Sequence, residues 1–232
     1  MNQLRGAYAK LARADETLIE FKALCVEICA AQAKATVIQT KMVRLPGMTE
    51  PVQMLTVDNS AHEPVPDKCG AIAGEIATNL WSALNYLVGQ LAILSAGSRG
   101  KRNQFPIEST PEAFKGNTSG TRGFLAGVSP AHAAAIERLQ PYNGCDWTKA
   151  LSKISNFDKH TDLVVISHDQ LVSGTILTQP AANGKSVDFH VKMHIEPALR
   201  IGLGDGMPLV ETLEVVKSEV SALLDAFKPE FK

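Results

Sequence analysis

The pattern of apolar residues is most distinctive from Ile76 to Ser98, a stretch in which no residue carries a formal charge. A helix that is apolar around most of its circumference lies at the centre of a fold or across a membrane. The stretch is interrupted by five polar side chains, Asn79, Ser82, Asn85, Tyr86 and Gln90. Arg99, Lys101 and Arg102 resemble the basic flank of a membrane span, which keeps that alternative open. Because buried amides are costly in hydrocarbon, we expect a central helix of a globular fold, starting near Lys68, and no membrane partner.

Long amphipathic helices are also expected near both ends of the chain. Apolar residues at steps of three, four and seven predict a first helix over residues 4–34. Pro208 opens a terminal helix whose apolar positions share one face. Between these helices, Ser129 predicts the N-cap of a helix over residues 130–140, and Asp146 predicts the start of a further one.

Strands are expected in two groups. Thr36 to Leu45 and Val52 to Val57 surround a Pro-Gly turn and predict an N-terminal hairpin. Three C-terminal strands are predicted at Leu163 to Ile166, Gly174 to Gln179 and Val187 to Ile195. The last of these alternates apolar and polar residues, as a half-buried strand does.

Helices and strands that come in blocks favour an α+β fold over an alternating parallel architecture. The predicted fold is a single α+β domain over residues 1–232, with long helices packed around the buried central helix. A small antiparallel sheet is expected from the N-terminal hairpin and the three C-terminal strands. The stretch 97–127, rich in Gly, Ser and Thr, is the only plausible domain boundary, and a draping or functional loop is the alternative there.

The composition is that of a globular protein, with 45% hydrophobic residues, 20% charged residues and a net charge of −1. This balance argues against a broad nucleic-acid surface but leaves room for a local basic patch. Cys25 and Cys29 share a helical face without further metal-ligand spacing, so no metal or other cofactor is predicted. The start of the chain, Met1 to Glu20, lacks the apolar core of a signal peptide, which predicts a cytoplasmic protein.

A line of polar side chains follows one face of the predicted central helix: Glu75, Asn79, Ser82, Tyr86 and Gln90. Buried hydrogen-bonding groups need partners, so the line demands an explanation. One interpretation is that these side chains bond to a neighbouring helix and fix the packing register. The other is that they line a pocket or an interface.

The segment from Asn156 to His160 lies where a helix is expected to give way to a strand, and such ends often expose functional groups. Asp158, Lys159 and His160 would supply a base, a cation and a titratable imidazole. If this turn meets the polar line, His160 is the predicted acid–base catalyst and Asp158 orients it. The predicted substrate-binding residues are then Asn79, Ser82, Tyr86 and Lys159. A solvated turn without function is the alternative.

Four short segments between residues 79 and 160 form a combination in a fixed order. They are Asn79-Leu80-Trp81-Ser82-Ala83-Leu84-Asn85-Tyr86, Phe105-Pro106-Ile107, Leu139-Gln140-Pro141-Tyr142 and Asn156-Phe157-Asp158-Lys159-His160. This combination resembles a family of uncharacterised bacterial proteins that carry N-L-R-S-A-L-D-H on a helix, then F-P-I, Q-P-Y and D-K-H-R. Because that family has no established activity, the resemblance implies a fold more than a function.

The family's helix motif contains R-x4-H, which is similar to the ribonuclease motif of HEPN helical domains from toxin and defence systems. In those domains Arg and His would act on RNA by transfer to the 2′-hydroxyl without a metal. Here Trp81 stands at the Arg position, Tyr86 at the His position, Asn85 at the Asp position and Thr161 at the final Arg position. Trp lacks a guanidinium charge, and Tyr, with an unperturbed pKa of about 10, is a poor acid–base group near neutrality. The resemblance therefore implies a HEPN-like relative with a degenerate motif.

Two classes of function follow from these observations. The first hypothesis is a non-catalytic cytoplasmic protein that binds a protein partner or forms a homo-oligomer through its long helices. The alternative is a ligand- or RNA-binding HEPN-like protein, or an enzyme, with a site between the Glu75–Gln90 line and the Asp158–His160 turn. A site predicts that Asp158, His160 and Tyr86 converge on one cleft, whereas a binding module predicts that they lie apart.

Overall fold

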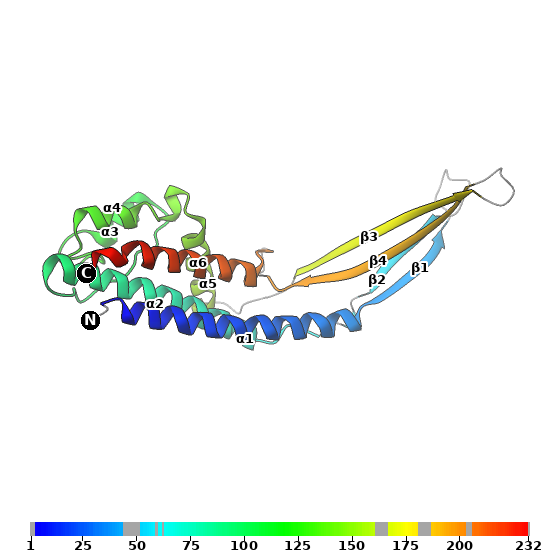
Figure 1. Cartoon of the computed structure of the whole chain (residues 1–232), viewed down its shortest axis with the longest axis horizontal. Helices are drawn as coiled ribbons and strands as arrows, with labels where there is room; N and C mark the ends of the chain where they lie inside the picture. The colour runs from blue at the N-terminus through cyan, green and yellow to red at the C-terminus, as the bar shows by residue number, and fades with distance from the viewer. Residues whose placement is uncertain are drawn as a thin grey trace.

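The computed structural model describes residues 3–43, 52–58, 60–61, 63–160, 167–180, 187–202 and 206–231. For residues 38, 40–43, 52–57, 156–160, 167–180 and 187–200 it describes the backbone alone. The elements in chain order are α1 (Arg5–Ala35), β1 (Val37–Val43), β2 (Val52–Asp58), α2 (Lys68–Ala96), α3 (Pro111–Thr118), α4 (Pro130–Glu137), η1 (Pro141–Asn143), α5 (Asp146–His160), β3 (Ser167–Pro180), β4 (Val187–Arg200), α6 (Leu209–Phe227) and η2 (Lys228–Glu230). Figure 1 shows that the helices form one elongated body, with both strand pairs beyond one of its ends.

The fold is mainly helical, and the predicted α+β domain with one antiparallel sheet is wrong. In the described chain β1 pairs with β2 and β3 pairs with β4, as two separate antiparallel pairs. The strand expected at Leu163 to Ile166 lies outside the described residues, and the other two C-terminal strands fall within β3 and β4. Where burial is described, the core comes from helices and the segments that connect them. The alternating pattern predicts a strand with one apolar face, but it does not determine what covers that face.

The long helix α1 packs antiparallel to α6. Three polar contacts join them, and their partners follow opposite orders along the two helices: Tyr8 with Asp225 at 2.7 Å, Asp15 with Lys217 at 2.6 Å, and Lys22 with Glu214. These contacts hold one side of α1 against the body. Because they are partly exposed ion pairs and hydrogen bonds, they contribute more to register than to stability.

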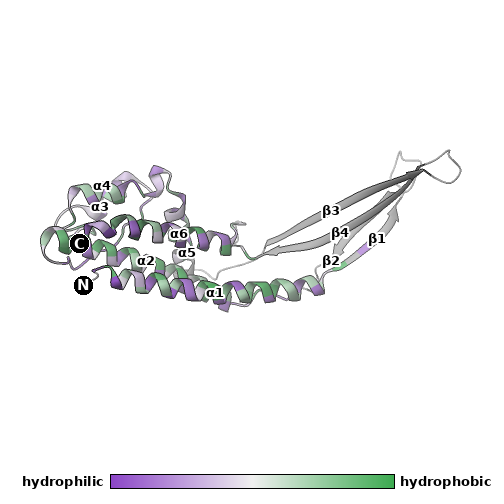
Figure 2. Ribbon diagram, in the orientation of Figure 1, coloured by the Kyte–Doolittle hydropathy of each residue, from purple (hydrophilic) through white to green (hydrophobic). Residues whose placement is uncertain are grey.

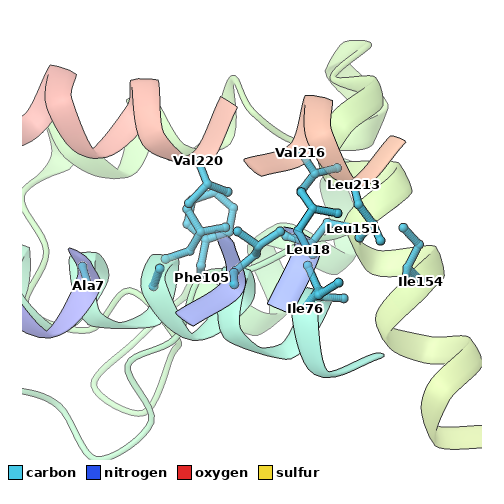
Figure 3. Packing of buried hydrophobic residues seen from close by; sticks show 14 of the residues in the cluster. Ala7, Leu18, Ile76, Phe105, Leu151, Ile154, Leu213, Val216 and Val220 are labelled. Atoms are coloured by element: carbon cyan, nitrogen blue, oxygen red, sulfur yellow. The ribbon is translucent and has the colours of Figure 1, made fainter. Parts of the chain in front are cut away.

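The core lies between α1, α2, α5 and α6, with α2 at its centre. The side chains labelled in Figure 3 come from all four helices and the segment after α2: Ala7, Leu18, Ile76, Phe105, Leu151, Ile154, Leu213, Val216 and Val220. In α2 the apolar positions recur every three or four residues on one face, and several are fully buried, including Ile76, Leu80, Leu84, Leu87 and Leu91. Among the described residues, no helix combines the length and the apolar character that crossing a membrane requires.

The stretch 97–127 packs into the same core instead of lying apart from it. Phe105, Phe114 and Leu125 are buried and belong to the main apolar cluster. The stretch also contains α3, which sequence analysis missed. Thr110 caps this helix by accepting a hydrogen bond from the Ala113 N–H at 3.2 Å. The signal was available, because Thr110 precedes a proline just as Ser129 does at the start of α4.

Candidate functional site

Two residues of the predicted polar line join α2 to α1. Lys10 Nζ donates a hydrogen bond to Asn79 Oδ1 at 3.1 Å, and the Asn79 side-chain amide donates to the Glu75 carbonyl at 3.1 Å. Arg13 forms an ion pair with the Glu75 carboxylate at 2.9 Å. Since Asn79 is buried, these bonds satisfy a polar group that would otherwise destabilise the fold. This part of the line fixes the register of α1 against α2.

Tyr86, a predicted substrate contact, lies at the edge of the same helix pair and is 40% exposed. Its ring packs on α1 at Gly6, where an added Cβ would lie 2.8 Å from a ring carbon. Glycine at that position therefore permits the close approach of the two helices. The Arg99 guanidinium carbon lies 6.0 Å from the centre of the Tyr86 ring, within the range of a cation–π contact. Tyr86 is thus part of the α1–α2 packing.

Two residues of the segment 79–86, which resembles the helix motif of the bacterial family, bond to the segment that follows α2. The Trp81 indole N–H donates to the Phe105 carbonyl at 3.0 Å. In return, the Phe105 N–H donates to Asn85 Oδ1 at 2.7 Å. Phe105 is fully buried in an irregular segment, so its backbone groups have no helix or strand to satisfy them. Trp81 and Asn85 supply the missing partners.

Gln140 belongs to the third of the four segments that resemble the bacterial family. It also bonds to the segment that follows α2. Its amide nitrogen donates to the carbonyls of Pro106 and Ile136, each at 3.0 Å, and its oxygen accepts from the Glu108 N–H at 2.9 Å. Three of the four resembling segments therefore meet as one hydrogen-bonded junction. Sequence reasoning did not select Asn85 or Gln140 as site residues. The signal available in the sequence was the apolar Phe105-Pro106 pair in an irregular stretch. If such a pair is buried, its backbone groups need side-chain partners.

A polar cleft of about 320 Å³ opens beside this junction. Its described lining comes from α2, the 97–127 stretch and α5, namely Thr78, Trp81, Ser82, Asn85, Gln104 and Ser155. We call it the motif cleft. Ser155 is only 2% exposed, and Ser82 is the member of the predicted substrate-binding set that the cleft contains. The described lining offers hydroxyl, amide and indole groups, which bind by hydrogen bonding and stacking but do not exchange protons near neutral pH.

The predicted catalytic residues follow Ser155 along α5. Asp158, Lys159 and His160 lie within α5, so the turn expected at these three residues is wrong. Their side chains lie outside the described residues, and their convergence with Tyr86 or Ser82 stays a prediction. Tyr86 itself does not line the motif cleft in the described part of the chain.

A hollow larger than the motif cleft, about 680 Å³, lies between α5 and the start of α6. Much of its lining is apolar and includes Trp147, Ala150, Met207 and Val216. None of the predicted site residues and none of the junction residues line it in the described chain. The motif cleft, although smaller, is therefore the candidate site, because residues of the sequence motifs line it.

The cysteines of the first two helices are unreactive in this environment. Burial raises the pKa of Cys25 to about 12 and also raises the pKa of Cys29 and Cys69. These thiols stay protonated near neutral pH, which makes them poor nucleophiles and poor metal ligands. Across the described ranges, no three His, Cys, Asp or Glu side chains are placed to hold a metal ion.

A second candidate surface lies on α1, which carries apolar residues that the body does not cover. Ile19 is 63% exposed and Val26 is 68% exposed. Together with the exposed Ala23 and Ala30 and the half-buried Ala33, they follow a 4-3-4-3 spacing along one face. We call these five residues the α1 outer stripe. Apolar residues recur along α1 in Figure 2, where this helix lies at the edge of the body.

Comparisons with known proteins add nothing to this geometry. The chain matches no protein-family model, and searches of curated proteins and of solved structures also find no match. The resemblance to the uncharacterised bacterial family and to HEPN domains therefore stays a prediction. The candidate functions rest on the motif cleft and on the α1 outer stripe.

Proposed function

We propose that this chain is a non-catalytic protein that associates with a second copy of itself through the α1 outer stripe. The observation that carries the proposal is the exposure of Ile19 and Val26, one heptad apart on the same helical face. Full burial of such a side chain contributes about 1.5–3 kcal/mol. Single exposed apolar residues are ordinary on protein surfaces, but a row at the spacing of paired helices favours a helical partner.

The order of side chains within the stripe supports a second copy as that partner. Ile19, Ala23, Val26 and Ala30 alternate large and small residues. In an antiparallel pair of α1 helices, Ile19 faces Ala30 of the other copy, and Ala23 faces Val26. Each large side chain then meets a small one, and both copies use the same surface, as a two-fold dimer requires. In a parallel pair, each large side chain would instead face the same large side chain of the other copy, and each alanine would face an alanine. The layers of the interface would then differ in volume.

The internal use of the motif residues supports a non-catalytic role. Trp81 and Asn85, which occupy the Arg and Asp positions of the resembling motif, are bonded to the Phe105 backbone. The four cysteines are free thiols, which fits the reducing cytoplasmic setting that is part of this proposal.

Analytical ultracentrifugation over a concentration series tests the association. We expect the native chain to form dimers and the double variant Ile19→Lys, Val26→Lys to be monomeric, with an unchanged helical circular dichroism spectrum. Val215→Lys is the matched control, because Val215 is 55% exposed on α6 and lies outside the stripe. A native chain that stays monomeric throughout, or an equal effect of the control, would contradict the proposal.

Cysteine cross-linking tests the antiparallel arrangement. In a Cys29→Ser background, we expect Ile19→Cys combined with Ala30→Cys to form covalent dimers under mild oxidation. Each single variant is the control and should cross-link weakly, since neither position faces its own copy. Strong cross-linking of Ile19→Cys alone would show a parallel pair instead.

A further inference from the structure

We propose that the end of α2 and the loop that follows it bind the surface of an anionic phospholipid membrane. This inference goes beyond self-association and uses no residue of the α1 outer stripe. The end of α2 lies at the tip of the helical body opposite the strand pairs (Figure 1). Partly exposed apolar or aromatic side chains and exposed cations occur together there: Tyr86, Ile93, Leu94, Arg99, Lys101 and Arg102. We call these six residues the α2 tip.

The helix α2 extends past the start of α1. The two helices are antiparallel, because Gly6 lies beside Tyr86 whereas Arg13 lies beside Glu75. Most of the segment 87–96 therefore projects beyond the first turn of α1, which is about 15 Å of helix. On this projecting part Ile93 is 38% exposed and Leu94 is 43% exposed. Exposed apolar side chains alone are ordinary, so the groups around them decide which partner fits.

Arg99 lies on the same face of α2 as Tyr86 and Ile93. The chain turns back at Gly97, whose φ of 74° is a left-handed conformation that glycine adopts without strain. The Arg99 side chain then lies against the helix, because a Cβ added to Gly89 would be 2.8 Å from Arg99 Nε. Tyr86, Gly89 and Ile93 are spaced at i, i+3 and i+7 and share one face. A cation is thus placed beside two exposed side chains.

The loop after α2 holds two more cations in fixed positions. Asn103 is buried, accepts from the Gly100 N–H at 2.5 Å and donates to the Phe124 carbonyl at 3.1 Å. The Arg102 guanidinium carbon lies 5.2 Å from the centre of the Phe124 ring, within the range of a cation–π contact. Lys101 and Arg102 are both exposed on this fixed loop. A partner therefore meets cations whose backbone is already ordered, which lowers the entropic cost of binding.

The charge of the α2 tip is positive. From Ile76 to Ile107 the sequence contains three cations and no Asp or Glu. Two acidic residues near the C-terminus have partners. Asp225 accepts a hydrogen bond from Tyr8, and the Glu230 carboxylate lies 3.8 Å from His132 Nε2. Each Lys or Arg near an anionic bilayer strengthens binding by about fivefold, so three cations are enough for measurable attraction.

The mixture of cations and aliphatic side chains favours a lipid surface over a nucleic acid. Anionic headgroups attract the cations, and aliphatic side chains enter the boundary between headgroups and acyl chains. Tyrosine is enriched at that boundary because its ring is apolar and its hydroxyl is polar. A nucleic acid would pair with the cations but would leave Ile93 and Leu94 in water. The sequence argued against a membrane because α2 contains amides, and in a surface contact these stay bonded inside the protein.

Sedimentation of the full chain with vesicles tests the proposal. We expect binding to vesicles of equimolar phosphatidylcholine and phosphatidylglycerol, weaker binding at high salt, and no binding to phosphatidylcholine alone. The double variant Lys101→Gln, Arg102→Gln should weaken binding by about 10- to 30-fold, since two cations are lost. Ile93→Gln should weaken it by about two- to tenfold, because an apolar side chain no longer leaves water.

Matched controls remove the same groups elsewhere. Lys68→Gln, Lys149→Gln removes two exposed cations, one at the opposite end of α2 and one on α5, and should leave binding within about twofold of native. Val215→Gln is the control for Ile93→Gln. Circular dichroism checks that each variant is folded. The charge variants keep the test valid if Ile93→Gln disturbs the end of α2, because Lys101 and Arg102 are exposed.

Three results would overturn the proposal. The first is no binding to the anionic vesicles, and the second is equal weakening by the α2-tip and control charge variants. The third is vesicle binding that a folded Ile93→Gln variant leaves unchanged, which would show attraction by charge alone. Binding of an oligothymidylate in place of vesicles, weakened by Lys101→Gln, Arg102→Gln, would show a nucleic-acid surface and also overturn it.

Discussion

The two apolar faces of α1 lie on one helix and have opposite environments. The inner face, which includes Ala14, Leu18 and Phe21, is buried against the body. The outer stripe, with Ile19 and Val26, stays exposed over the same length of helix. Both faces carry the spacing that predicts a packed helix, so the pattern alone does not separate them. An amphipathic pattern shows which faces favour burial, and the docking of the other helices decides which face is buried within one chain.

The largest expected difference between the faces comes from side-chain truncation. Phe21→Ala should lower the free energy of unfolding by about 3–5 kcal/mol, because Phe21 is fully buried and its removal leaves a cavity. Ile19→Ala should change it by no more than about 0.5 kcal/mol in the monomer, since that side chain is mostly exposed. Urea denaturation at low protein concentration measures both. Similar losses at the two positions would contradict the assignment of the faces.

Replacing an alanine on each face by leucine should have smaller effects than the truncations. The buried substitution should lower the stability of the monomer, whereas the exposed one should weaken self-association. Ala14→Leu should destabilise the monomer by about 1–3 kcal/mol, because Ala14 is fully buried and the added atoms overpack the core. Ala23→Leu should leave the monomer intact, since Ala23 is exposed. In the proposed dimer, however, the new leucine would meet Val26 of the other copy and weaken association. Thermal unfolding and ultracentrifugation of the two variants check the two halves of this prediction.

The smallest effect concerns the contact between Tyr8 and α6. Burial, followed by the hydrogen bond to Asp225, raises the pKa of Tyr8 to about 12. The unfolded pKa is about 10, so the fold favours the protonated phenol. This stabilisation is complete below about pH 10 and is lost as the pH rises toward 12.

Comparing the native chain with Tyr8→Phe in urea at increasing pH tests this dependence. The stability difference between the two should shrink from neutral pH to about pH 12. Tyr142, whose pKa burial and Glu137 raise to about 12, titrates in both chains and cancels from the comparison. A difference that grows with pH would show that Tyr8 is not held in its protonated form.

Local signals predicted the helices well. Apolar spacing placed the first and central helices close to α1 and α2, and a proline after a capping side chain marked the start of α4. The same capping signal at Thr110 was passed over because its surroundings are rich in Gly, Ser and Thr, and α3 was missed. The single sheet was wrong because strand patterns were combined without knowledge of their partners.

The predicted site was harder to anticipate because its residues depend on distant partners. Asn79 and Glu75 were selected as polar residues on an apolar helix, but Lys10 and Arg13, which bond to them, lie more than sixty positions earlier in the chain. No local pattern shows such a pairing. Ser155 was not selected either, although it is the buried hydroxyl of the motif cleft.

The sequence by itself determined the helices, because capping and apolar periodicity depend on residues only a few positions apart. It also determined that α1 has two apolar faces, since both are present in the order of its residues. The tertiary structure decided which of those faces is covered and which polar side chains satisfy the buried backbone of Phe105. These outcomes depend on segments far apart in the chain, whose meeting is fixed by the packing of the whole body.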